Sequence, residues 1–372
     1  MLSFWEKNSF VKYDNIIIGS GILGLSVACS IKEKSPSASV LILERGIFPE
    51  GASTRNAGFA CFGSLSEILS DFNRIGIDET VSLVEKRWRG INILRKRLGD
   101  ERIGLLNYGG YELIDNKHLH SIDKIKEVND KIRHIFDSDT FEVKNEKLKD
   151  FGFNESIIKC IVYSKFESQI DTGKMMNSLI NYAAGLGIKI INGCCVEAVR
   201  EKENYVKLIT KSYSGADQIS FEGKRIIVCT NAFTKSLLPG MNIKPARGQV
   251  IVTKPVEELK FKGVFHFDEG FYYFRNYENR IIFGGGRNLD FKKEETTDFE
   301  SNEKIVNDLK QKLETMILPG QEFEIDSTWS GIMGFTENKL PLIEKLSDRI
   351  VCIISCNGMG VALASWVAER IV

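Results

Sequence analysis

The sequence predicts an α/β protein with two domains, one built on a parallel sheet and the other, of the α+β kind, on an antiparallel sheet. Three observations support this prediction. A buried strand, a glycine turn and a helix occur at each end of the chain. Between residues 250 and 329 the pattern changes to alternating, aromatic-rich strands. The length of 372 residues also exceeds one ordinary domain, and the 43% hydrophobic content is enough to bury a substantial core.

The first strand and helix meet at a turn that contains three glycines. Residues 15–18 are a β-branched run typical of a buried strand, and residues 23–34 have apolar positions at helical spacing. Gly19, Gly21 and Gly24 fit the pattern G-x-G-x-x-G. In that pattern the first glycine permits a tight turn, the second lets a pyrophosphate approach the backbone, and the third lets helix pack on strand. A Rossmann-like dinucleotide-binding domain is therefore predicted.

The glycine pattern alone would also fit a tight strand-to-helix turn without a ligand. The residues that follow the turn favour a ligand. The helix N-terminus at Ile22 and Leu23 would face phosphate groups with unpaired N–H groups and a favourable dipole. The next apolar strand, residues 40–43, ends in Glu44 and Arg45. Glu44 follows the last glycine by 20 residues, where a carboxylate can accept both ribose hydroxyls. The sequence thus predicts an adenine dinucleotide site for NAD or FAD.

Charge and composition limit the classes of partner. The 50 basic and 50 acidic side chains balance, so no global field attracts nucleic acid or an anionic membrane. The sequence has no uninterrupted apolar stretch of about 18 residues and its first residues do not resemble a signal peptide. We therefore expect a cytoplasmic protein without a transmembrane segment, and we expect its partner to be a small molecule and not a nucleic acid.

The cysteines and histidines do not predict a metal site. Most cysteines stand in apolar segments and none forms a C-x-x-C pair, so we expect reduced, buried thiols. Only Cys61 and Cys356 fall near the motifs described here. The histidines lack metal-binding spacing, so surface or core positions are expected for them. The four histidines are His118, His120, His134 and His266.

The remaining segments indicate how the two domains are interleaved. Residues 81–149 are rich in charge and read as helices with a solvated face. A helix and further buried strands follow up to about residue 233, and the chain ends in a second strand, glycine turn and helix. The predicted nucleotide-binding domain is therefore discontinuous, with segments 1–75, 150–245 and 330–372. The predicted substrate domain comprises residues 76–149 and 246–329.

Several motifs together resemble one family. The segments are "SFWEK", "GSGILG", "LILERG", "GASTRNAGF", "QIDTGKMMNSL", "VCTNAFT", "PARGQV", "IIFGGGR", "LPLIE" and "NGMGVALA", and they extend over most of the chain. They resemble the FAD-dependent oxidoreductases similar to D-amino-acid oxidase, glycine oxidase and sarcosine oxidase. Within that family the sequence is most similar to the γ-glutamylputrescine oxidase-like branch. The resemblance implies FAD as the cofactor.

The resemblance also implies where FAD would lie. The "GASTRNAGF" loop would run beside the pyrophosphate and the flavin ring, because small residues suit a chain that lies flat against a planar group; an ordinary Gly/Ser/Asn loop is the alternative. A strand backbone would meet the adenine, and the last glycine turn would aim a helix N-terminus at flavin N1. The FAD-contacting residues implied beyond the first motif are Ala52, Ser53, Arg55, Asn56, Ala57, Gly58, Val196, Thr230, Asn231, Gly358, Met359 and Gly360.

One motif departs from the family pattern. Members that oxidise α-amino acids carry W-x-G-x-R, whose arginine binds the substrate carboxylate. Met333 stands in the place of that arginine, and also in the place of the cysteine that bonds to flavin in sarcosine oxidases. We therefore expect non-covalent FAD. Either the substrate is an amine without an α-carboxylate, or Arg275 or Arg287 supplies the anchor, and Tyr273 is a further candidate for substrate contact.

The predicted reaction is oxidation of the C–N bond of an amine or amino acid. Hydride would pass to flavin N5 and leave an imine that water hydrolyses. Orientation and exclusion of water would supply most of the rate, so no residue is assigned as a catalytic acid or base. The alternatives are an FAD-dependent 2-hydroxy acid dehydrogenase, or an FAD-binding protein with a role in tRNA modification or in structure. The electron acceptor and the oligomeric state are left open.

Overall fold

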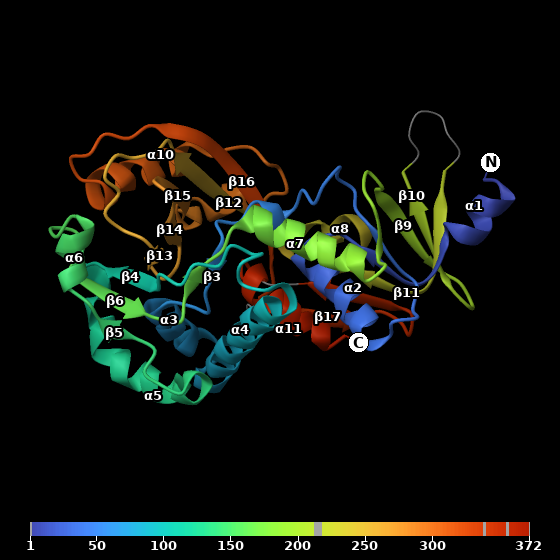
Figure 1. Ribbon diagram of the computed structural model, residues 1–372, viewed down its shortest axis with the longest axis horizontal. Helices are drawn as coiled ribbons and strands as arrows, with labels where there is room; N and C mark the ends of the chain where they lie inside the picture. The colour runs from blue at the N-terminus through green and yellow to red at the C-terminus, as the bar shows by residue number, and fades with distance from the viewer. Residues whose placement is uncertain (1, 212–217, 338–339, 355–356, 372) are drawn as a thin grey trace.

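The computed structural model describes residues 2–211, 218–337, 340–354 and 357–371. Two eight-stranded sheets lie at opposite ends of an elongated molecule (Figure 1). A short third ladder pairs β3 (Phe59–Ala60) with β7 (Ser168–Gln169). Among the described residues, the structure contains no helix with the length and apolarity needed to span a bilayer.

The first sheet has the strand order β17-β18-β11-β1-β2-β8. The five strands from β18 to β8 run parallel, and β17 is antiparallel to β18. Two further strands, β9 and β10, extend antiparallel from β11. The strands of this sheet are β1 (Lys12–Ile18), β2 (Val40–Leu43), β8 (Lys189–Ile191), β9 (Val196–Glu201), β10 (Val206–Thr210), β11 (Ser220–Val228), β17 (Leu342–Lys345) and β18 (Ile350–Ile354).

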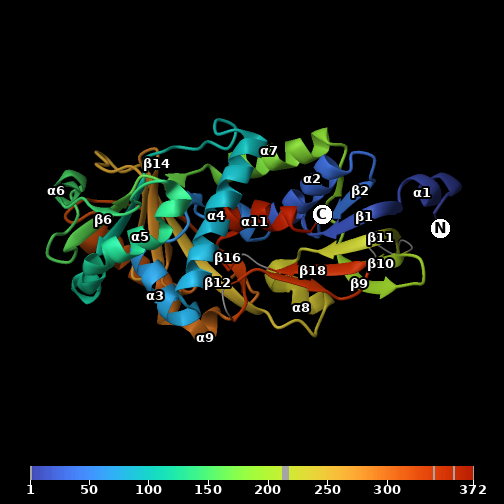
Figure 2. The ribbon, with the colours of Figure 1, turned by 90° about the horizontal axis from the view of Figure 1, so that it is seen from below.

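Alternate side chains of the parallel strands enter two separate cores. Ile17 and Ile42 pack under helices on one face, whereas Ile16 and Leu41 face β10 and the segment after β11. Figure 2 shows α2 and α7 on one side of the sheet and α8, β9 and β10 on the other. Fully buried parallel strands show such continuous apolar runs. The helices of this half are α2 (Ile22–Lys34), α4 (Ile77–Leu98), α7 (Thr172–Gly185), α8 (Thr234–Leu237) and α11 (Gly360–Glu369), and α1 (Phe4–Ser9) projects at the amino end.

The second sheet has the order β16-β12-β15-β14-β13-β4-β6-β5, and all of its pairs except β13–β4 are antiparallel. One face carries an aromatic core in which the rings of Phe265 and Phe274 stack at 4.6 Å. Its strands are β4 (Gly110–Ile114), β5 (Glu142–Val143), β6 (Cys160–Ser164), β12 (Lys244–Thr253), β13 (Val264–Phe267), β14 (Tyr272–Tyr277), β15 (Arg280–Gly285) and β16 (Ile325–Phe335). Its helices are α3 (Leu65–Ile75), α5 (Ile125–Phe136), α6 (Glu146–Phe151), α9 (Phe291–Glu294) and α10 (Glu303–Lys312), which continues into the π-helical turn Leu313–Ile317.

The α/β fold class is confirmed, but several elements lie elsewhere than the predicted domain division places them, among them α3, α4, β6 and the end of β16. Strand β6 belongs to the second sheet, although residues 150–245 were assigned to the nucleotide-binding domain. Helix α4 packs on α11 so closely that a side chain at Gly90 would overlap the Ala362 carbonyl oxygen. An apolar run shows that a segment is buried but does not show which sheet it joins. The division itself remains a prediction.

Candidate active site

A cavity of about 620 Å³ is lined by residues of both sheets. One wall comes from the carboxyl ends of β1, β2 and β11 and from the start of α2 and α11. The other wall comes from β12, β14, β15 and β16. Ligands of open α/β sheets bind outside the carboxyl ends of the strands, so the cavity lies where such a fold places its ligand.

The glycine turn after β1 is shaped by close backbone contacts. Gly19 has φ +103°, and a Cβ there would lie 2.8 Å from the Cys229 carbonyl oxygen. A Cβ at Gly24 would overlap the carbonyl oxygen of Gly19, so this glycine packs helix on strand and does not line the cavity. Gly21 caps α2 without a side chain, and the Ile22 amide donates to Ser53 Oγ at 2.9 Å. This turn exposes a helix N-terminus to the cavity.

Glu44 lies at the end of β2, on the cavity wall. One carboxylate oxygen accepts hydrogen bonds from the Ser20 amide at 2.9 Å and hydroxyl at 2.8 Å, and the other accepts from the Gly46 amide at 3.0 Å. A carboxylate offers about four acceptor positions, so capacity remains for a ribose hydroxyl. The neighbouring Arg45 guanidinium lies 3.7 Å from the centre of the Phe233 ring.

Side chains of the loop at residues 52–58 hold the loop itself in place. Asn56 Nδ2 donates to the Ser53 carbonyl at 2.7 Å, and Asn56 Oδ1 accepts from the Gly58 amide at 2.9 Å. Arg55 Nη1 donates to the Ser330 carbonyl of β16 at 3.1 Å. These two polar side chains therefore tie the loop to itself and to the second sheet, and its small residues line the cavity.

Arg275 supports the same loop from the other side. Its Nε donates to the Ala57 carbonyl and its Nη1 to the Asn276 carbonyl at 3.1 Å. A Cβ at Gly58 would lie 2.7 Å from Arg275 Nη2. Burial lowers the pKa of Arg275 to about 10, and the side chain does not line the cavity. The structure thus does not bring this predicted substrate anchor to the site.

The other three predicted substrate contacts meet in the cavity. Tyr273, Arg287 and Met333 all line it. A Cβ at Gly248 would lie 3.1 Å from Met333 Cε and 3.8 Å from Tyr273 Oη, so that glycine keeps space open between them. Burial raises the pKa of Tyr273 to about 12, so its phenol is a neutral hydrogen-bonding group. The adjacent Tyr272 faces the aromatic core instead.

Arg287 is held between two aromatic rings. Its guanidinium carbon lies 4.9 Å from the Phe291 ring centre and 4.6 Å from that of Phe335. Burial lowers the pKa of Arg287. Within residues 2–211, 218–337, 340–354 and 357–371, no carboxylate lies within ion-pair distance of this guanidinium. An arginine placed in this way is available to a carboxylate of a ligand.

The last glycine turn joins the two walls. Gly358 has φ +87°, and a Cβ there would lie 3.3 Å from Met333 Sδ. Asn357 Oδ1 accepts from the Thr336 amide at 2.8 Å, which fixes the turn to the end of β16. Helix α11 then begins at Gly360 on the cavity wall. Cys356 lies outside the described residues.

Most of the predicted FAD contacts line this one cavity, Val196, Thr230 and Asn231 among them. Several polar residues at the cavity edge were not predicted from the sequence, although the apolar run around His266 carried a signal for one of them. Phe265 and Phe267 enter the aromatic core, so alternation places His266 on the opposite face, where it lines the cavity. The missed lining residues include Cys61, Glu67, Arg87 and His266.

The cavity fits a dinucleotide in its donor set and its shape. Helix α2 presents an N-terminus whose cap residue has no side chain. The loop that would follow a planar ring presents small residues, and glycines keep the opposite wall open. Residues of both walls would therefore hold an extended ligand with a phosphate portion and a planar portion.

Comparisons with known proteins identify the ligand class. Residues 14–372 match the family described as "FAD dependent oxidoreductase" (DAO). The "Probable oxidoreductase OrdL" of Haemophilus influenzae is 25% identical over 96% of this chain and 81% of its own. Glycine oxidase from Geobacillus kaustophilus has a similar structure, with a TM-score of 0.77, 19% identity, and coverage of 97% of this chain and 94% of that one.

A second structure gives the same picture of the fold. L-proline dehydrogenase from P. horikoshii superposes with a TM-score of 0.76 and 16% identity, over 97% of this chain and 92% of that chain. At this identity the likeness shows the fold alone. The family match over almost the whole sequence shows more: this chain belongs to the DAO family of FAD-dependent oxidoreductases, and it is an enzyme with FAD as its cofactor.

Proposed function

We propose that this enzyme oxidises the C–N bond of a small amine or amino acid that also carries a carboxylate, with FAD held non-covalently. Arg287 carries the proposal, because its guanidinium lines the cavity and has no carboxylate partner among the described residues. Met333 stands on the same wall and contributes no charge. Arg287 would therefore take over the anchoring role of the arginine that Met333 replaces.

The chain's own residues would bind and orient the substrate. When bound, FAD would accept at N5 the hydride from the carbon next to nitrogen, and water would hydrolyse the resulting imine. Arg287 would fix the carboxylate, Tyr273 would donate a hydrogen bond from a neutral phenol, and Met333 would form an apolar wall. Positioning and exclusion of water would supply most of the rate, and we assign no catalytic acid or base.

The γ-glutamylputrescine oxidase-like branch fits this substrate class, because γ-glutamylputrescine combines an amine with a distant carboxylate. A 2-hydroxy acid is the second candidate, since Arg287 would anchor its carboxylate equally well. We further propose a cytoplasmic enzyme without nucleic-acid partners. The balanced charge and the free thiols of the described cysteines support this part of the proposal.

Anaerobic mixing separates the two substrate classes. FAD-loaded protein is mixed under nitrogen with primary amines, N-methyl amino acids, α-amino acids and 2-hydroxy acids, and flavin absorbance is followed. We expect bleaching by one nitrogen-containing class, with release of the matching carbonyl product. Bleaching by 2-hydroxy acids alone would replace the proposal with the second candidate, and bleaching by none would favour a structural flavin.

A further inference from the structure

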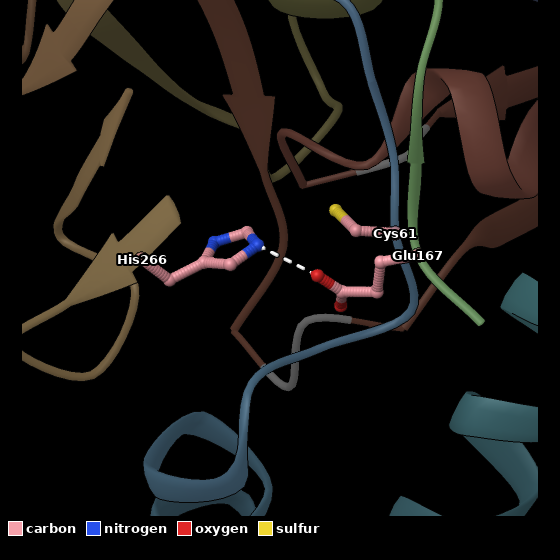
Figure 3. A group of neighbouring side chains, drawn as sticks. All are labelled: Cys61, Glu167 and His266. Carbon is pink, nitrogen blue, oxygen red and sulfur yellow. Dashed lines mark hydrogen bonds and ion pairs between the residues drawn. The ribbon is translucent and has the colours of Figure 1, made fainter. Parts of the chain in front are cut away.

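A cluster of three chemically different side chains lies at the edge of the cavity. Cys61 follows β3, Glu167 precedes β7, and His266 belongs to β13. One potential ligand atom from each residue lies within 4.8 Å of the others, and all three residues are buried. Figure 3 shows the thiol and the carboxylate reaching toward the imidazole from two neighbouring segments.

We propose that Cys61, Glu167 and His266 bind a zinc ion, with the fourth coordination position open to the cavity. Thiolate, carboxylate and imidazole are the ligand types of Zn²⁺, and three protein ligands with one open position are typical of its reactive sites. Cys61 and His266 line the cavity, whereas Glu167 does not. The open position would hold water or an oxygen group of a ligand.

The distances between the ligand atoms allow one cation to contact the thiol, the carboxylate and the imidazole together. Zn²⁺ binds N, O and S ligands at about 2.0–2.3 Å, so its ligand atoms lie a little over 3 Å apart. His266 Nε2 lies 2.9 Å from Glu167 Oε2, which requires only a small separation to admit the ion. The Cys61 thiol is free of disulfide bonds. Gly110 leaves the space that the Glu167 carboxylate occupies, because a Cβ at this position would overlap Glu167 Oε2.

An unpartnered atom is a second observation in favour of a ligand. Glu167 is 2% exposed, and its Oε1 has no hydrogen-bond partner among the described residues. Buried polar atoms are rarely left without a partner. By contrast, the nearby buried Glu112 accepts bonds from Ser64 Oγ at 2.9 Å and from the Ser66 amide at 3.1 Å. The unsatisfied carboxylate is thus the one that belongs to the cluster.

The charges around the cluster also suit a divalent cation. Burial raises the pKa of the Cys61 thiol, and the carboxylates of Glu167 and Glu67 add to the shift. Burial lowers the pKa of His266, but the carboxylates of Glu167, Glu112 and Glu67 together outweigh it and the net shift is upward. The carboxylates that face the thiol and the imidazole supply negative charge, which a bound Zn²⁺ would offset.

The rings around the cluster shield it from bulk water. Phe59 contacts the His266 ring edge to face at 5.2 Å and the Tyr273 ring at 5.6 Å. Arg87, a buried guanidinium that lines the cavity, pairs with Glu67 at 3.2 Å and donates to the Phe62 carbonyl at 2.9 Å. The Arg87 guanidinium therefore does not pair with the carboxylate of Glu167.

Metal content tests the inference directly. FAD-loaded full-length protein is dialysed against Zn²⁺, and bound metal is measured by atomic emission for the wild type and for Cys61→Ser, His266→Gln and Cys160→Ser. Cys160 is a matched control, because its thiol is also buried and lies outside the cluster, in the sheet that carries His266. We expect one zinc per chain, an affinity at least about tenfold weaker in the two cluster variants, and no change in the control. No retained zinc, or equal retention in all variants, would overturn the inference.

A measurement on the wild type covers the case in which a variant does not fold. Co²⁺ replaces Zn²⁺, and a thiolate-to-cobalt absorption band is sought in the difference spectrum against metal-free holoenzyme. In parallel, Zn²⁺ is expected to protect Cys61 but not Cys160 from alkylation, as read by mass spectrometry. Absence of both effects would exclude the site. These readouts do not depend on turnover, so they stand apart from the test of the proposed function.

Discussion

The two walls of the cavity are built in different ways. On the nucleotide wall, the glycine turn is packed backbone against backbone, and the positions of Gly19 and Gly24 leave no room for side chains. On the substrate wall, side chains such as Tyr273, Arg287 and Met333 define the surface. The first wall would bind a cofactor common to a family, and the second would select the substrate. Substitutions on the two walls should therefore have different consequences.

The largest expected effect is at the nucleotide wall. Gly24→Ala places a Cβ on the Gly19 carbonyl oxygen and should cost at least about 1–3 kcal/mol in the free energy of unfolding, with loss of FAD. Gly185→Ala in α7 is the control, because a Cβ there meets open space and the change should stay within about 1 kcal/mol. Chemical denaturation and flavin content measure both. A Gly24→Ala protein that keeps FAD and stability would contradict the account of this turn.

Arg275 in β14 and Arg287 after β15 should separate stability from binding. Arg275→Met leaves the buried carbonyls of Ala57 and Asn276 without their donor and should cost about 1–3 kcal/mol in unfolding free energy. Arg287→Met removes a guanidinium stacked on aromatic rings and should cost about 1 kcal/mol or less. Urea titration of both variants checks the order. Equal losses would mean that Arg287 also has a structural role.

A smaller effect is expected at the start of α2. Ser53→Ala removes the acceptor of the Ile22 amide and should weaken the helix cap by about 1 kcal/mol, which corresponds to an FAD dissociation constant about fivefold higher. Ser37→Ala is an exposed control. Fluorescence titration of apoprotein with FAD gives both constants. An unchanged constant in Ser53→Ala would show that the cap does not contribute to cofactor binding.

The smallest effect concerns pH and lies away from the cavity. The Lys224 ammonium, together with the Ser39 amide and hydroxyl, lowers the pKa of Asp14 to about 2. The ionised carboxylate therefore stabilises the fold above its ordinary pKa of 3.8, and this contribution is lost as pH falls from there toward 2. Asp14 is partly exposed, so screening should keep the effect below about 1 kcal/mol.

Unfolding free energies at about pH 5 and about pH 3 test this for the wild type and Asp14→Asn. The wild type should lose more stability over this interval than the variant does. FAD affinity should be equal in the two proteins at the higher pH. A larger loss in Asp14→Asn would reverse the sign of the argument.

The same comparison explains what could be predicted from the sequence. The glycine spacing and Glu44 predicted a dinucleotide turn, because a backbone contact leaves a local pattern in the chain. The substrate wall depends on which way each side chain points. Arg275 lies in β14 and Arg287 follows the end of β15, yet the first donates to the loop carbonyl of Ala57 and the second lines the cavity.

Contacts between residues far apart in the chain were the second feature that could not be predicted from the sequence. The sequence did not show that β6 joins the second sheet, because an apolar strand is compatible with either partner. For the same reason His266 was expected to be an ordinary core or surface histidine. Its contact with Glu167 joins residues 99 positions apart in the chain, and no spacing rule brings them together.

The most direct test of the central claim compares pairs of amines that differ only in the carboxylate. Anaerobic flavin bleaching is titrated with each member of a pair, for the wild type and for Arg287→Met. We predict that the wild type binds the carboxylate-bearing member at least about tenfold more tightly, and that the variant loses this preference while keeping FAD. A preference that survives in Arg287→Met, or a wild type that binds both members equally, would contradict the division of roles between the two walls.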